Sequence, residues 1–580
     1  MIQLFRNLRM AVGVAGAHLT DDPVLLLQQI SRRLPARVVQ PLAAGMGMIA
    51  RPRSTAVPVL LAALLRGDAG DLGRRLNLAV DGNPSKARAG HLTDIAVAAN
   101  LPELADRFLA MTEGTPRLKR ALARRFWYDG ALTAGIDSLN GAGRGGRRQL
   151  AHFSAEASVL EDWTPVLERR SYEPVRGRVL HLLTNSLPHT ASGYAQRSHS
   201  ILRAQQDAGW EVMAVTRIGY PVQVGKLLAK SLDLVDDVSY RRLLPSKLAA
   251  TADARLQQQA EELLNVALEF KPSVLHTTTH YINGLVVRAV AEALGIPWVY
   301  EVRGQLADTW ASSRGPAARE SEKYRLFQKR EVEIMQDADL VVTLGETMKA
   351  NIIAAGVPSR NILIAPNAVG EGFLQEPPSA AAARCEIGLP AEGQFIGTVS
   401  SLVPYEGIDD LIGAFCLLAR SNLHLRLLIV GDGASMPSLV EQAQQSGFGP
   451  RILFTGRVSR DEAIRYHQSL DVFVVPRKDL EVTRSVTPLK PVEALACGRP
   501  VVASRLPALE EIVRDQVNGL LVSAESPESL AAALGRILAD EPSRQAMGRA
   551  GREDVLRTRT WAANAQLLVA AYHHLEHEEY

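Results

Sequence analysis

The strongest constraint on the fold is a pattern of short Val-, Ile- and Leu-rich runs separated by helical stretches, which starts at Arg178. Such runs are typical of buried parallel strands in β-α-β units. They form two sets, at 179–183, 211–216, 274–277, 298–302, 340–344 and 362–365, and at 395–399, 425–430, 452–455, 472–475, 501–503 and 519–522. No hairpin signal separates these runs. The pattern predicts two doubly wound domains that face each other across a ligand-binding cleft.

Composition excludes several other classes of protein. The 580 residues are 47% hydrophobic and 22% charged, which is typical of a multidomain globular protein and not of a disordered or collagen-like chain. Three cysteines, Cys385, Cys416 and Cys497, form no close pair and argue against a disulfide framework or a cysteine-rich metal site. We therefore expect a cytoplasmic protein.

The amino-terminal region has no recognisable export signal. The apolar run at 10–19 ends in Asp21-Asp22 without a convincing cleavage site. A helix that spans a membrane needs about 20 apolar residues, and this run and the one at 56–65 each have half that length. We interpret both as core or interfacial helices.

The first 150 residues carry 21 Lys and Arg against 11 Asp and Glu, although the whole chain has a net charge of only +3. A basic region favours an anionic surface, while solvated arginines on helices are the alternative. No nucleic-acid-binding signature accompanies the charge, so no nucleic-acid partner is expected. The membrane hypothesis rests on Arg6, Arg9, Arg32, Arg33, Arg37, Arg51 and Arg53.

Residues 1–139 show helical spacing of apolar side chains and are predicted to form an all-α, repeat-like domain. Leu72, Leu104 and Leu132 are spaced like helical hairpins of the tetratricopeptide type, without that family's consensus. A protein-docking module is therefore the alternative to membrane binding. The glycine-rich stretch at 140–148 predicts a linker over residues 140–177.

The segment from Arg477 to Ala503 contains the most informative local pattern. A cationic loop follows the strand at 472–475, and Thr487-Pro488 is predicted to open a helix whose free amides attract an anion. Lys490 and Glu493 are spaced i and i+3, so they share one face of that helix. This pair suits a diphosphate and sugar hydroxyls, with an exposed Lys–Glu pair as the structural alternative. In the first domain, Gly193 follows the first strand, where glycine permits close approach to a phosphate or sugar.

The longer motifs resemble glycosyltransferase family 4 of the GT-B fold. The resemblance covers about residues 178–580 and is most specific at 487–503; the motifs that carry it lie at 181–194, 300–304, 365–368, 430–433, 454–457 and 487–503. It implies an α/β protein with two Rossmann-like doubly wound domains (GT-B), preceded by the all-α N-terminal domain. The implied boundaries are 178–370 for an acceptor domain, 371–560 for a nucleotide-sugar donor domain, and 561–580 for a crossover helix that returns to the first of these.

The resemblance also implies roles for individual residues. In the family, the glutamate that matches Glu493 binds the ribose hydroxyls, and the lysine that matches Lys490 neutralises the diphosphate. The backbone at 454–458 is expected to contact the edge of the nucleobase. The predicted donor-binding set is Arg457, Val458, Arg477, Lys478, Arg484, Thr487, Leu489, Lys490 and Glu493. The predicted catalytic set is Gly193, His280 and Arg303, with a structural ion pair as the alternative for Arg303 and a structural or acceptor-contacting role as the alternative for His280.

Three positions depart from the family pattern. Ser485 stands where a first glutamate is usual, and Ser401 and Glu406 replace a customary Arg and Lys. The cations Arg477, Lys478, Arg484 and Lys490 would then supply the missing charges. We interpret the departures as variation of a family branch.

The resemblance implies a retaining glycosyltransferase that uses a nucleotide sugar, expected to be UDP-linked. The acceptor would be a glycan or a lipid-linked molecule of cell-surface polysaccharide or glycolipid synthesis, met at the inner face of the plasma membrane. No cofactor and no obligatory metal is expected, and no Asp-x-Asp motif follows a strand. A nucleotide-sugar 2-epimerase and a non-enzymatic scaffold remain the alternatives.

Overall fold

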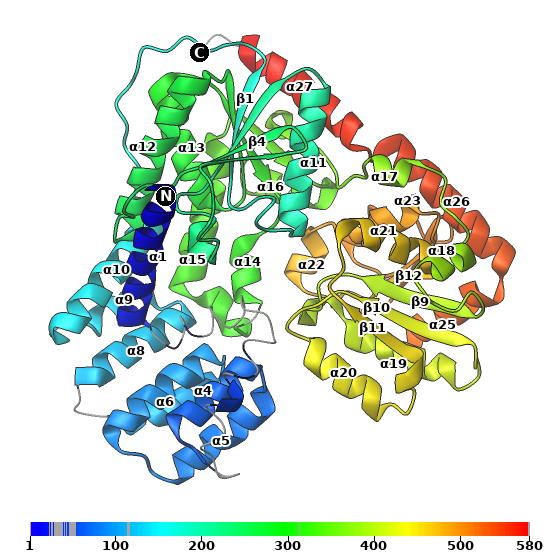
Figure 1. The fold of residues 1–580 in the computed structure, drawn as a ribbon, viewed down its shortest axis with the longest axis horizontal. Helices are drawn as coiled ribbons and strands as arrows, with labels where there is room; N and C mark the ends of the chain where they lie inside the picture. The colour runs from blue at the N-terminus through cyan, green and yellow to red at the C-terminus, as the bar shows by residue number, and fades with distance from the viewer. Residues whose placement is uncertain are drawn as a thin grey trace.

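The computed structural model describes residues 2–22, 54–112, 116–312 and 314–577, together with positions 24, 27, 39, 41 and 43–45. It contains a helical N-terminal region and two α/β domains (Figure 1). This confirms the predicted fold class. Five arginines of the membrane hypothesis lie outside the described residues, namely Arg32, Arg33, Arg37, Arg51 and Arg53.

The helical region is built on a compact apolar core. Leu60, Leu76, Leu92 and Phe108 are all fully buried in one cluster, because apolar side chains recur at helical spacing in consecutive helices. These helices are α4 (Val57–Arg66), α5 (Ala69–Asp81), α6 (Lys86–Ala98) and α7 (Pro102–Ala110). They are followed by α8 (Pro116–Asp129) and α9 (Leu132–Asp137), whereas α1 (Ile2–Asp21) packs against the first α/β domain.

The predicted linker at 140–177 is wrong over much of its length. Residues Gly143–Glu161 form the helix α10 in spite of their glycines. The reason is an apolar stripe that includes Phe153, which stacks on Trp127, and Leu160, which joins the core of the first α/β domain. Burial of this stripe outweighs the cost of glycine in a helix. Residues 162–177 connect α10 to the first strand without helix or strand.

The first α/β domain contains a sheet of eight strands in the order β3-β4-β2-β1-β5-β6-β7-β8. All neighbours pair in parallel except β3 and β4. The strands are β1 (Arg178–Leu183), β2 (Glu211–Thr216), β3 (Leu232–Val235), β4 (Val238–Arg242), β5 (Val274–Thr278), β6 (Trp298–Val302), β7 (Leu340–Thr343) and β8 (Ile362–Ile364). The longer helices on this sheet are α11 (Gly193–Asp207), α12 (Ala252–Phe270), α13 (Tyr281–Leu294), α14 (Leu306–Ala311), α15 (Glu322–Asp337) and α16 (Glu346–Ala354).

Two strands of the first sheet that the sequence did not predict, β3 and β4, form a hairpin. The strands β3 and β4 are antiparallel and are joined at Asp236 and Asp237, both of which have positive φ. This turn lacks the Asn-Gly or Asp-Gly pair that usually marks a two-residue hairpin. The edge strand also exposes Leu232 and Leu234, so its apolar pattern does not indicate a buried face.

The second α/β domain contains the six strands that the sequence predicts, all parallel, in the order β11-β10-β9-β12-β13-β14. Gly431 and Gly433 are required here, because a Cβ atom at either position would overlap the backbone of Ser400 or Leu402. The strands are β9 (Gln394–Val399), β10 (Leu425–Val430), β11 (Ile452–Gly456), β12 (Val472–Val475), β13 (Val501–Ser504) and β14 (Gly519–Val522). The helices include α17 (Glu371–Leu374), α18 (Ala380–Glu386), α19 (Ile408–Ala419), α20 (Met436–Gln445), α21 (Arg460–Ser469), α22 (Glu481–Ser485), α23 (Lys490–Ala496), α24 (Pro507–Glu510) and α25 (Pro527–Ala539).

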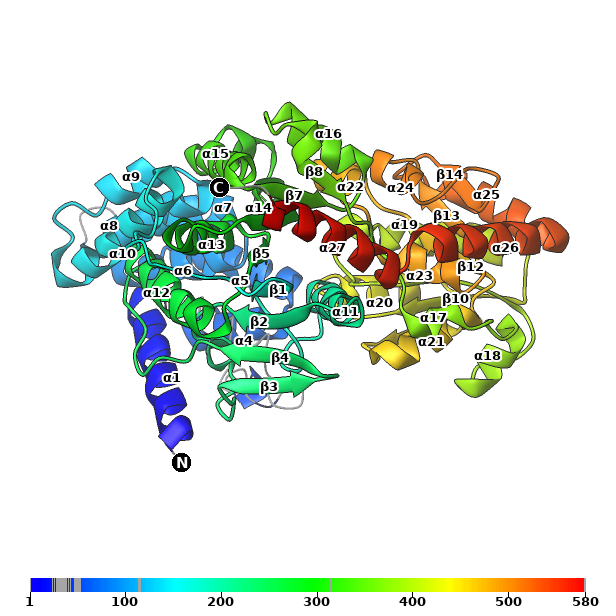
Figure 2. The same ribbon diagram turned by 90° about the horizontal axis from the view of Figure 1, so that it is seen from above.

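The chain ends by crossing back over both domains. Helix α26 (Glu541–Thr558) lies on the second domain, and α27 (Trp561–His577) lies against α11 of the first (Figure 2). Trp561 and Tyr572 are buried in the same apolar cluster as strands of the first sheet. This helix therefore ties the two domains together.

Candidate active site

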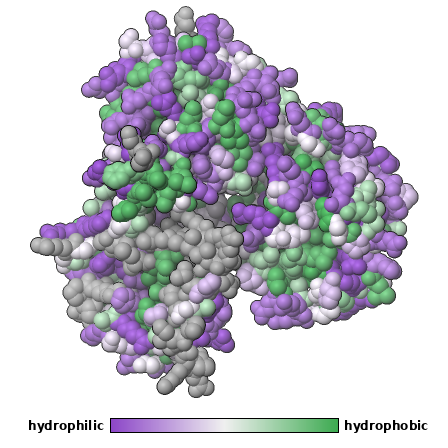
Figure 3. All heavy atoms as spheres, in the orientation of Figure 1, coloured by the Kyte–Doolittle hydropathy of each residue, from purple (hydrophilic) through white to green (hydrophobic). Residues whose placement is uncertain are grey.

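A hollow separates the two α/β domains on the surface (Figure 3). Several side-chain hydrogen bonds bridge this boundary, and two of them involve the segment that precedes α23. Asn367 Nδ2 donates to the carbonyl oxygen of Thr487 over 2.8 Å, and Asn351 Nδ2 donates to Ser485 Oγ over 3.0 Å. The segment that precedes α23 is therefore held directly against the first domain. Ser485, the position of the missing glutamate, has a bridging role.

On the first-domain side, Gly193 is the first residue of α11. Ser192 caps this helix by accepting a hydrogen bond from the backbone of Ala195, and the glycine itself is exposed. A Cβ atom placed on Gly193 would meet nothing within 4 Å. The open space over this helix start is what close approach of a ligand requires.

A buried ion pair lies behind the Gly193 helix. Glu301, at the end of β6, is 1% exposed; its Oε1 accepts from Arg197 Nη2 at 2.7 Å and its Oε2 from Arg303 Nη2 at 2.5 Å. Burial alone would raise the pKa of this carboxyl, but Arg303 and Arg197 hold the pKa well below its usual range. Arg197 also donates to Asn367, which links this cluster to the bridge with Thr487.

Replacing Glu301 by Gln should destabilise the protein by about 3–5 kcal/mol at pH 7, because two buried arginines would lose their shared counter-charge. Urea denaturation followed by circular dichroism measures this loss. A matched control is Glu211→Gln, which breaks a half-exposed pair with Arg178 and should cost under about 1 kcal/mol. Similar losses in both variants would contradict the importance of burial.

Arg303 and His280 both have structural partners. Arg303 donates to Ser198 Oγ and to the carbonyl oxygen of Tyr194, so the structural ion pair that the sequence left open for this residue is present. His280 caps α13 through its Nδ1, which accepts from the backbone of Ile282, and its ring stacks on Phe327. Burial lowers the pKa of His280 to about 4, so its ring is neutral at pH 7. These contacts make His280 a helix-capping residue, and both of its named partners belong to the first domain.

On the second-domain side, Glu493 and Lys490 form the pair that their spacing predicts. Lys490 Nζ donates to Glu493 Oε2 over 2.7 Å, and His467 Nε2 lies 3.3 Å from the same oxygen. Burial would raise the pKa of Glu493, but Lys490 and His467 lower it to about 2. The carboxylate is therefore ionised and buried, while the ammonium of Lys490 is half exposed. The helix starts at Lys490 and not at Thr487, because Pro491 occupies its first turn.

Three cations of the predicted donor set are already paired with carboxylates. Arg477 makes two hydrogen bonds to Glu406, and Arg484 makes two to Asp479. Lys478 Nζ lies 2.5 Å from Asp409 Oδ2. Glu406 thus neutralises Arg477 instead of leaving it to compensate for a missing charge. Lys490 is also paired, but its partner Glu493 is itself a predicted ligand-binding group.

The remaining predicted residues lie around this pair. Thr487 is buried and its Oγ1 has no hydrogen-bond partner, and Leu489 packs against the first-domain cluster that contains Trp561. Arg457 is exposed and Val458 half-buried, both directly after β11. The structure therefore brings Thr487, Leu489, Lys490 and Glu493 together at the domain boundary.

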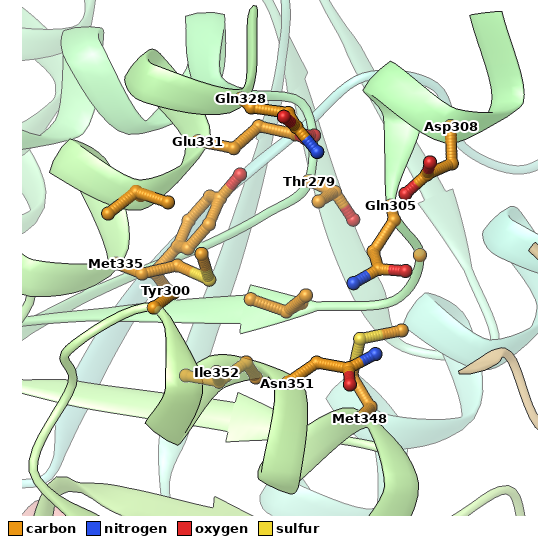
Figure 4. Close-up of a pocket in the computed structure, with 14 residues that line it drawn as sticks. Thr279, Tyr300, Gln305, Asp308, Gln328, Glu331, Met335, Met348, Asn351 and Ile352 are labelled. Carbon is orange, nitrogen blue, oxygen red and sulfur yellow. The ribbon is translucent and has the colours of Figure 1, made fainter. Parts of the chain in front are cut away.

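A cavity of about 260 Å³ opens beside the boundary, among the ends of β5 and β6 and helices α14, α15 and α16. In the close-up, Tyr300, Glu331 and Gln305 surround the same open space (Figure 4). The Tyr300 hydroxyl is buried and has no hydrogen-bond partner. Asn351, which bridges to Ser485, also lines the cavity. The cavity therefore borders the domain boundary at Ser485 and offers polar groups to a ligand.

Because of Glu331, the free energy of unfolding should fall as the pH rises from about 4.5 to 7. Burial raises the pKa of Glu331 to about 7, above the usual carboxyl value near 4.5, although backbone amides of Leu306 and Ala307 oppose the shift. The folded state then holds a proton that the unfolded state releases between about pH 4.5 and 7, so stability is lost over that window, by at most about 1.4 kcal/mol per pH unit. Urea denaturation at stepped pH values should show a smaller slope for Glu331→Gln than for wild type. An unchanged slope would contradict the shifted pKa.

Several residues of the site were missed by sequence reasoning. Glu301 and Asn367 lie inside motifs that the sequence analysis singled out, at 300–304 and 365–368, and could have been chosen there. Arg197, His467 and Glu331 carried no local signal, because their partners are distant in sequence. Within the described part of the chain, no group of three or more His, Cys, Asp or Glu side chains is placed to hold a metal ion. Among the residues that the structure describes, no helix is both long enough and apolar enough to cross a bilayer.

Comparison with known proteins agrees with this architecture. Residues 380–554 match the family of glycosyl transferases group 1, and residues 192–368 match the glycosyl transferase 4-like domain. This chain belongs to glycosyltransferase family 4. The family's two domains coincide with the two α/β domains, and the helical region precedes both matches.

The curated relatives of this family 4 chain include two groups of named enzymes. A D-inositol 3-phosphate glycosyltransferase of Segniliparus rotundus is 28% identical over 312 residues, which are 52% of this chain and 66% of the relative. A GDP-mannose-dependent alpha-(1-6)-phosphatidylinositol monomannoside mannosyltransferase of Mycolicibacterium smegmatis is 32% identical over 231 residues, 39% of this chain and 60% of the relative. The chain thus spans 60–66% of the length of these two relatives.

Solved structures agree on the fold of this family 4 chain. Sucrose-phosphate synthase of Thermosynechococcus elongatus superposes with a TM-score of 0.58 at 22% identity, covering 69% of this chain and 99% of that one. The Anabaena protein HepE, solved with UDP, gives a TM-score of 0.54 at 17% identity, covering 68% of this chain and 100% of that one. Both likenesses establish the GT-B fold of the two α/β domains.

Proposed function

We propose that this chain is a retaining glycosyltransferase that moves a hexosyl group from a UDP-linked donor to a glycan or lipid-linked acceptor. The observation that carries the proposal is the buried, ionised Glu493 beside the half-exposed Lys490 at the domain boundary. A buried carboxylate accepts strong hydrogen bonds from the two ribose hydroxyls, and an ammonium neutralises the diphosphate. Family membership supports the same arrangement.

The proposed reaction exchanges one bond at the anomeric carbon. The bond from that carbon to the diphosphate oxygen breaks, and Lys490 stabilises the negative charge that develops on the leaving group. The acceptor hydroxyl attacks from the same face and passes its proton to the departing phosphate, which retains the anomeric configuration. Positioning of the two substrates contributes the remaining rate enhancement, with Gly193 leaving room for the sugar. In this proposal neither a cofactor nor an obligatory metal takes part.

We assign the acceptor to the cavity beside the domain boundary. The unpaired hydroxyl of Tyr300 and the amide of Gln305 suit the hydroxyl groups of a sugar or polyol. Burial raises the pKa of Glu331 to about 7, so its protonated form, which is present near neutral pH, would donate a hydrogen bond without adding a buried charge. The names of two relatives include inositol phosphate and a phosphatidylinositol mannoside, which fits a polyol or lipid-linked acceptor.

A donor screen by mass spectrometry tests the proposal. Purified protein is incubated with UDP-hexoses and with GDP-mannose, which the name of one relative gives as a donor, in the presence and absence of lipid and glycan acceptors. A transferase forms sugar-extended acceptor and releases nucleotide in proportion. A 2-epimerase interconverts the donor sugar without any acceptor product, and a scaffold does neither. Transfer from GDP-mannose alone would overturn the UDP assignment only.

We place the reaction at the cytoplasmic face of the plasma membrane, with the basic region 1–150 as the contact to anionic lipid. Of the arginines proposed for that contact, Arg6 and Arg9 are among the described residues, and both are exposed on α1. The alternative for the helical domain is a protein partner bound to its surface. Co-sedimentation with vesicles separates these alternatives, because binding to lipid charge falls as salt rises.

A further inference from the structure

Helix α1 is fixed to the first α/β domain by one of its faces. Asn7 is fully buried, and its Nδ2 donates to the carbonyl oxygens of Leu227 and Ala229, both over 2.9 Å. Met10 is buried beside Val222 in the same small cluster. The helix therefore has a defined orientation, and Figure 2 shows it projecting from the rest of the chain with its N-terminal end outermost.

The face turned away from this contact carries an exposed apolar stripe. At 100° per residue, positions 4, 5, 8 and 12 fall on one side of the helix, opposite Met10. Phe5 is 71% exposed and Val12 is 70% exposed, and Leu4 and Leu8 are also exposed. Apolar side chains gather where α1 comes toward the viewer (Figure 3). Because α1 is held by its opposite face, through Asn7 and Met10, the fold does not require these exposed apolar side chains.

Basic side chains flank the stripe. Arg6 and Arg9 are exposed on the adjoining side of α1, and no acidic residue precedes Asp21 in the chain. The loop that accepts the Asn7 hydrogen bonds places Leu228 next to the helix, 82% exposed, between exposed Lys226 and Lys230. We call Leu4, Phe5, Leu8, Val12 and Leu228 with Arg6, Arg9, Lys226 and Lys230 the α1 patch.

We propose that the α1 patch binds the surface of an anionic phospholipid bilayer. Apolar side chains of an amphipathic helix insert at the level of the headgroups, and each nearby Lys or Arg adds about 1 kcal/mol of attraction to anionic lipid. Charge complementarity decides between occupants, because a second copy of the patch would bring like charges together. This inference narrows the membrane contact from the whole basic region to one helix and one loop, and it needs no donor or acceptor to be tested.

The experiment is flotation of the full-length protein with vesicles of phosphatidylcholine alone or with about one third phosphatidylglycerol, at low and high salt. Wild type should float with the anionic vesicles at low salt and be released by salt. The double variant Phe5→Ser/Val12→Ser should bind at least about tenfold more weakly, since inserting one Phe side chain into the bilayer is by itself worth about a factor of ten or more. The double variant Arg6→Gln/Arg9→Gln should bind about 30-fold more weakly and lose much of its salt dependence.

Matched controls keep the test specific to the patch. Leu423→Ser removes a side chain that is 77% exposed in the second domain, and Arg557→Gln removes a charge that is 73% exposed on α26. Both should bind vesicles like wild type. Thermal unfolding and nucleotide binding, measured without lipid, should be unchanged in every variant, so failure of this proposal is distinguishable from failure of the proposed enzymatic function.

Three outcomes would overturn the proposal. The first is that wild type fails to bind anionic vesicles at low salt. The second is that the α1 variants bind as well as the controls. The third is that light scattering shows wild-type dimers that Phe5→Ser/Val12→Ser abolishes while vesicle binding is unaffected, which would make the stripe a contact between copies.

Discussion

Sugar transfer should fall by at least about 100-fold when Glu493 is replaced by Ala or Gln, and severely when Lys490 is replaced by Ala. In the proposed complex Glu493 accepts two charge-assisted hydrogen bonds from ribose, worth about 1.5–3 kcal/mol each, and the substituted side chain cannot replace that charge. Lys490 is half exposed and faces the boundary, so its loss removes charge from the diphosphate site and not from the core. Transfer rate and thermal midpoint are measured on the same preparations.

The matched control for this pair is on helix α26. Arg557 pairs with Asp554 at the same i, i+3 spacing, but its side chain is 73% exposed and pairs with none of the predicted donor-binding residues, so Arg557→Ala should leave transfer unchanged. Because Glu493 is buried and ionised, its variants should also lose folding stability, so transfer is measured at a temperature where each variant is folded. A loss of about 3–5 kcal/mol without any fall in transfer would indicate a structural ion pair instead. Wild-type transfer in both the Glu493 and Lys490 variants would remove the donor-site assignment.

Deleting residues 561–580 should abolish cooperative folding. The deletion removes Trp561, Leu568 and Tyr572 from the apolar cluster on the first sheet. Each large buried side chain is worth about 2–5 kcal/mol, and together they approach the total stability of about 5–15 kcal/mol that a domain has. Aggregation or a featureless melting curve is expected. A truncated protein with normal melting and turnover would contradict the role of α27.

A milder variant keeps this prediction testable if the truncated protein cannot be isolated. The Tyr572 hydroxyl accepts from Gln205 Nε2 over 2.9 Å and lies 2.5 Å from His276 Nδ1. Burial lowers the pKa of His276 to about 4, so its ring is neutral at pH 7, and in the tautomer protonated at Nε2 its Nδ1 accepts the tyrosine proton. Tyr572→Phe should therefore cost about 1–3 kcal/mol. Leu567→Ala, on the exposed side of the same helix, is the control and should cost under about 0.5 kcal/mol.

The sequence predicted the repeated architecture because buried parallel strands have a strong apolar signal. All six strands of the second domain are at the predicted places, and six of eight in the first. The hairpin of β3 and β4 was missed for two reasons. Its apolar side chains Leu232 and Leu234 are exposed instead of buried, and its turn contains two aspartates instead of the common Asn-Gly or Asp-Gly pair. The glycine-rich segment formed α10 because tertiary packing of residues such as Phe153 decided its conformation.

The site was predictable where its residues are close in sequence. The spacing of Lys490 and Glu493 is sufficient to place both on one helix face. Pairings between distant segments were not predictable from the sequence. Arg477 was predicted to be an available cation, but in the structure it forms an ion pair with Glu406, which lies far from it in sequence. His467 reaches Glu493 in the same way, from a helix with no motif of its own.

The central claim is that the buried carboxylate on α23 receives a nucleotide. Isothermal titration calorimetry of UDP and GDP into wild type and Glu493→Gln tests it most directly. One of the two nucleotides should bind wild type, and the variant, shown by circular dichroism to be folded at the temperature used, should bind that nucleotide at least about 100-fold more weakly. Equal binding to both proteins, or no binding of either nucleotide to wild type, would contradict the account.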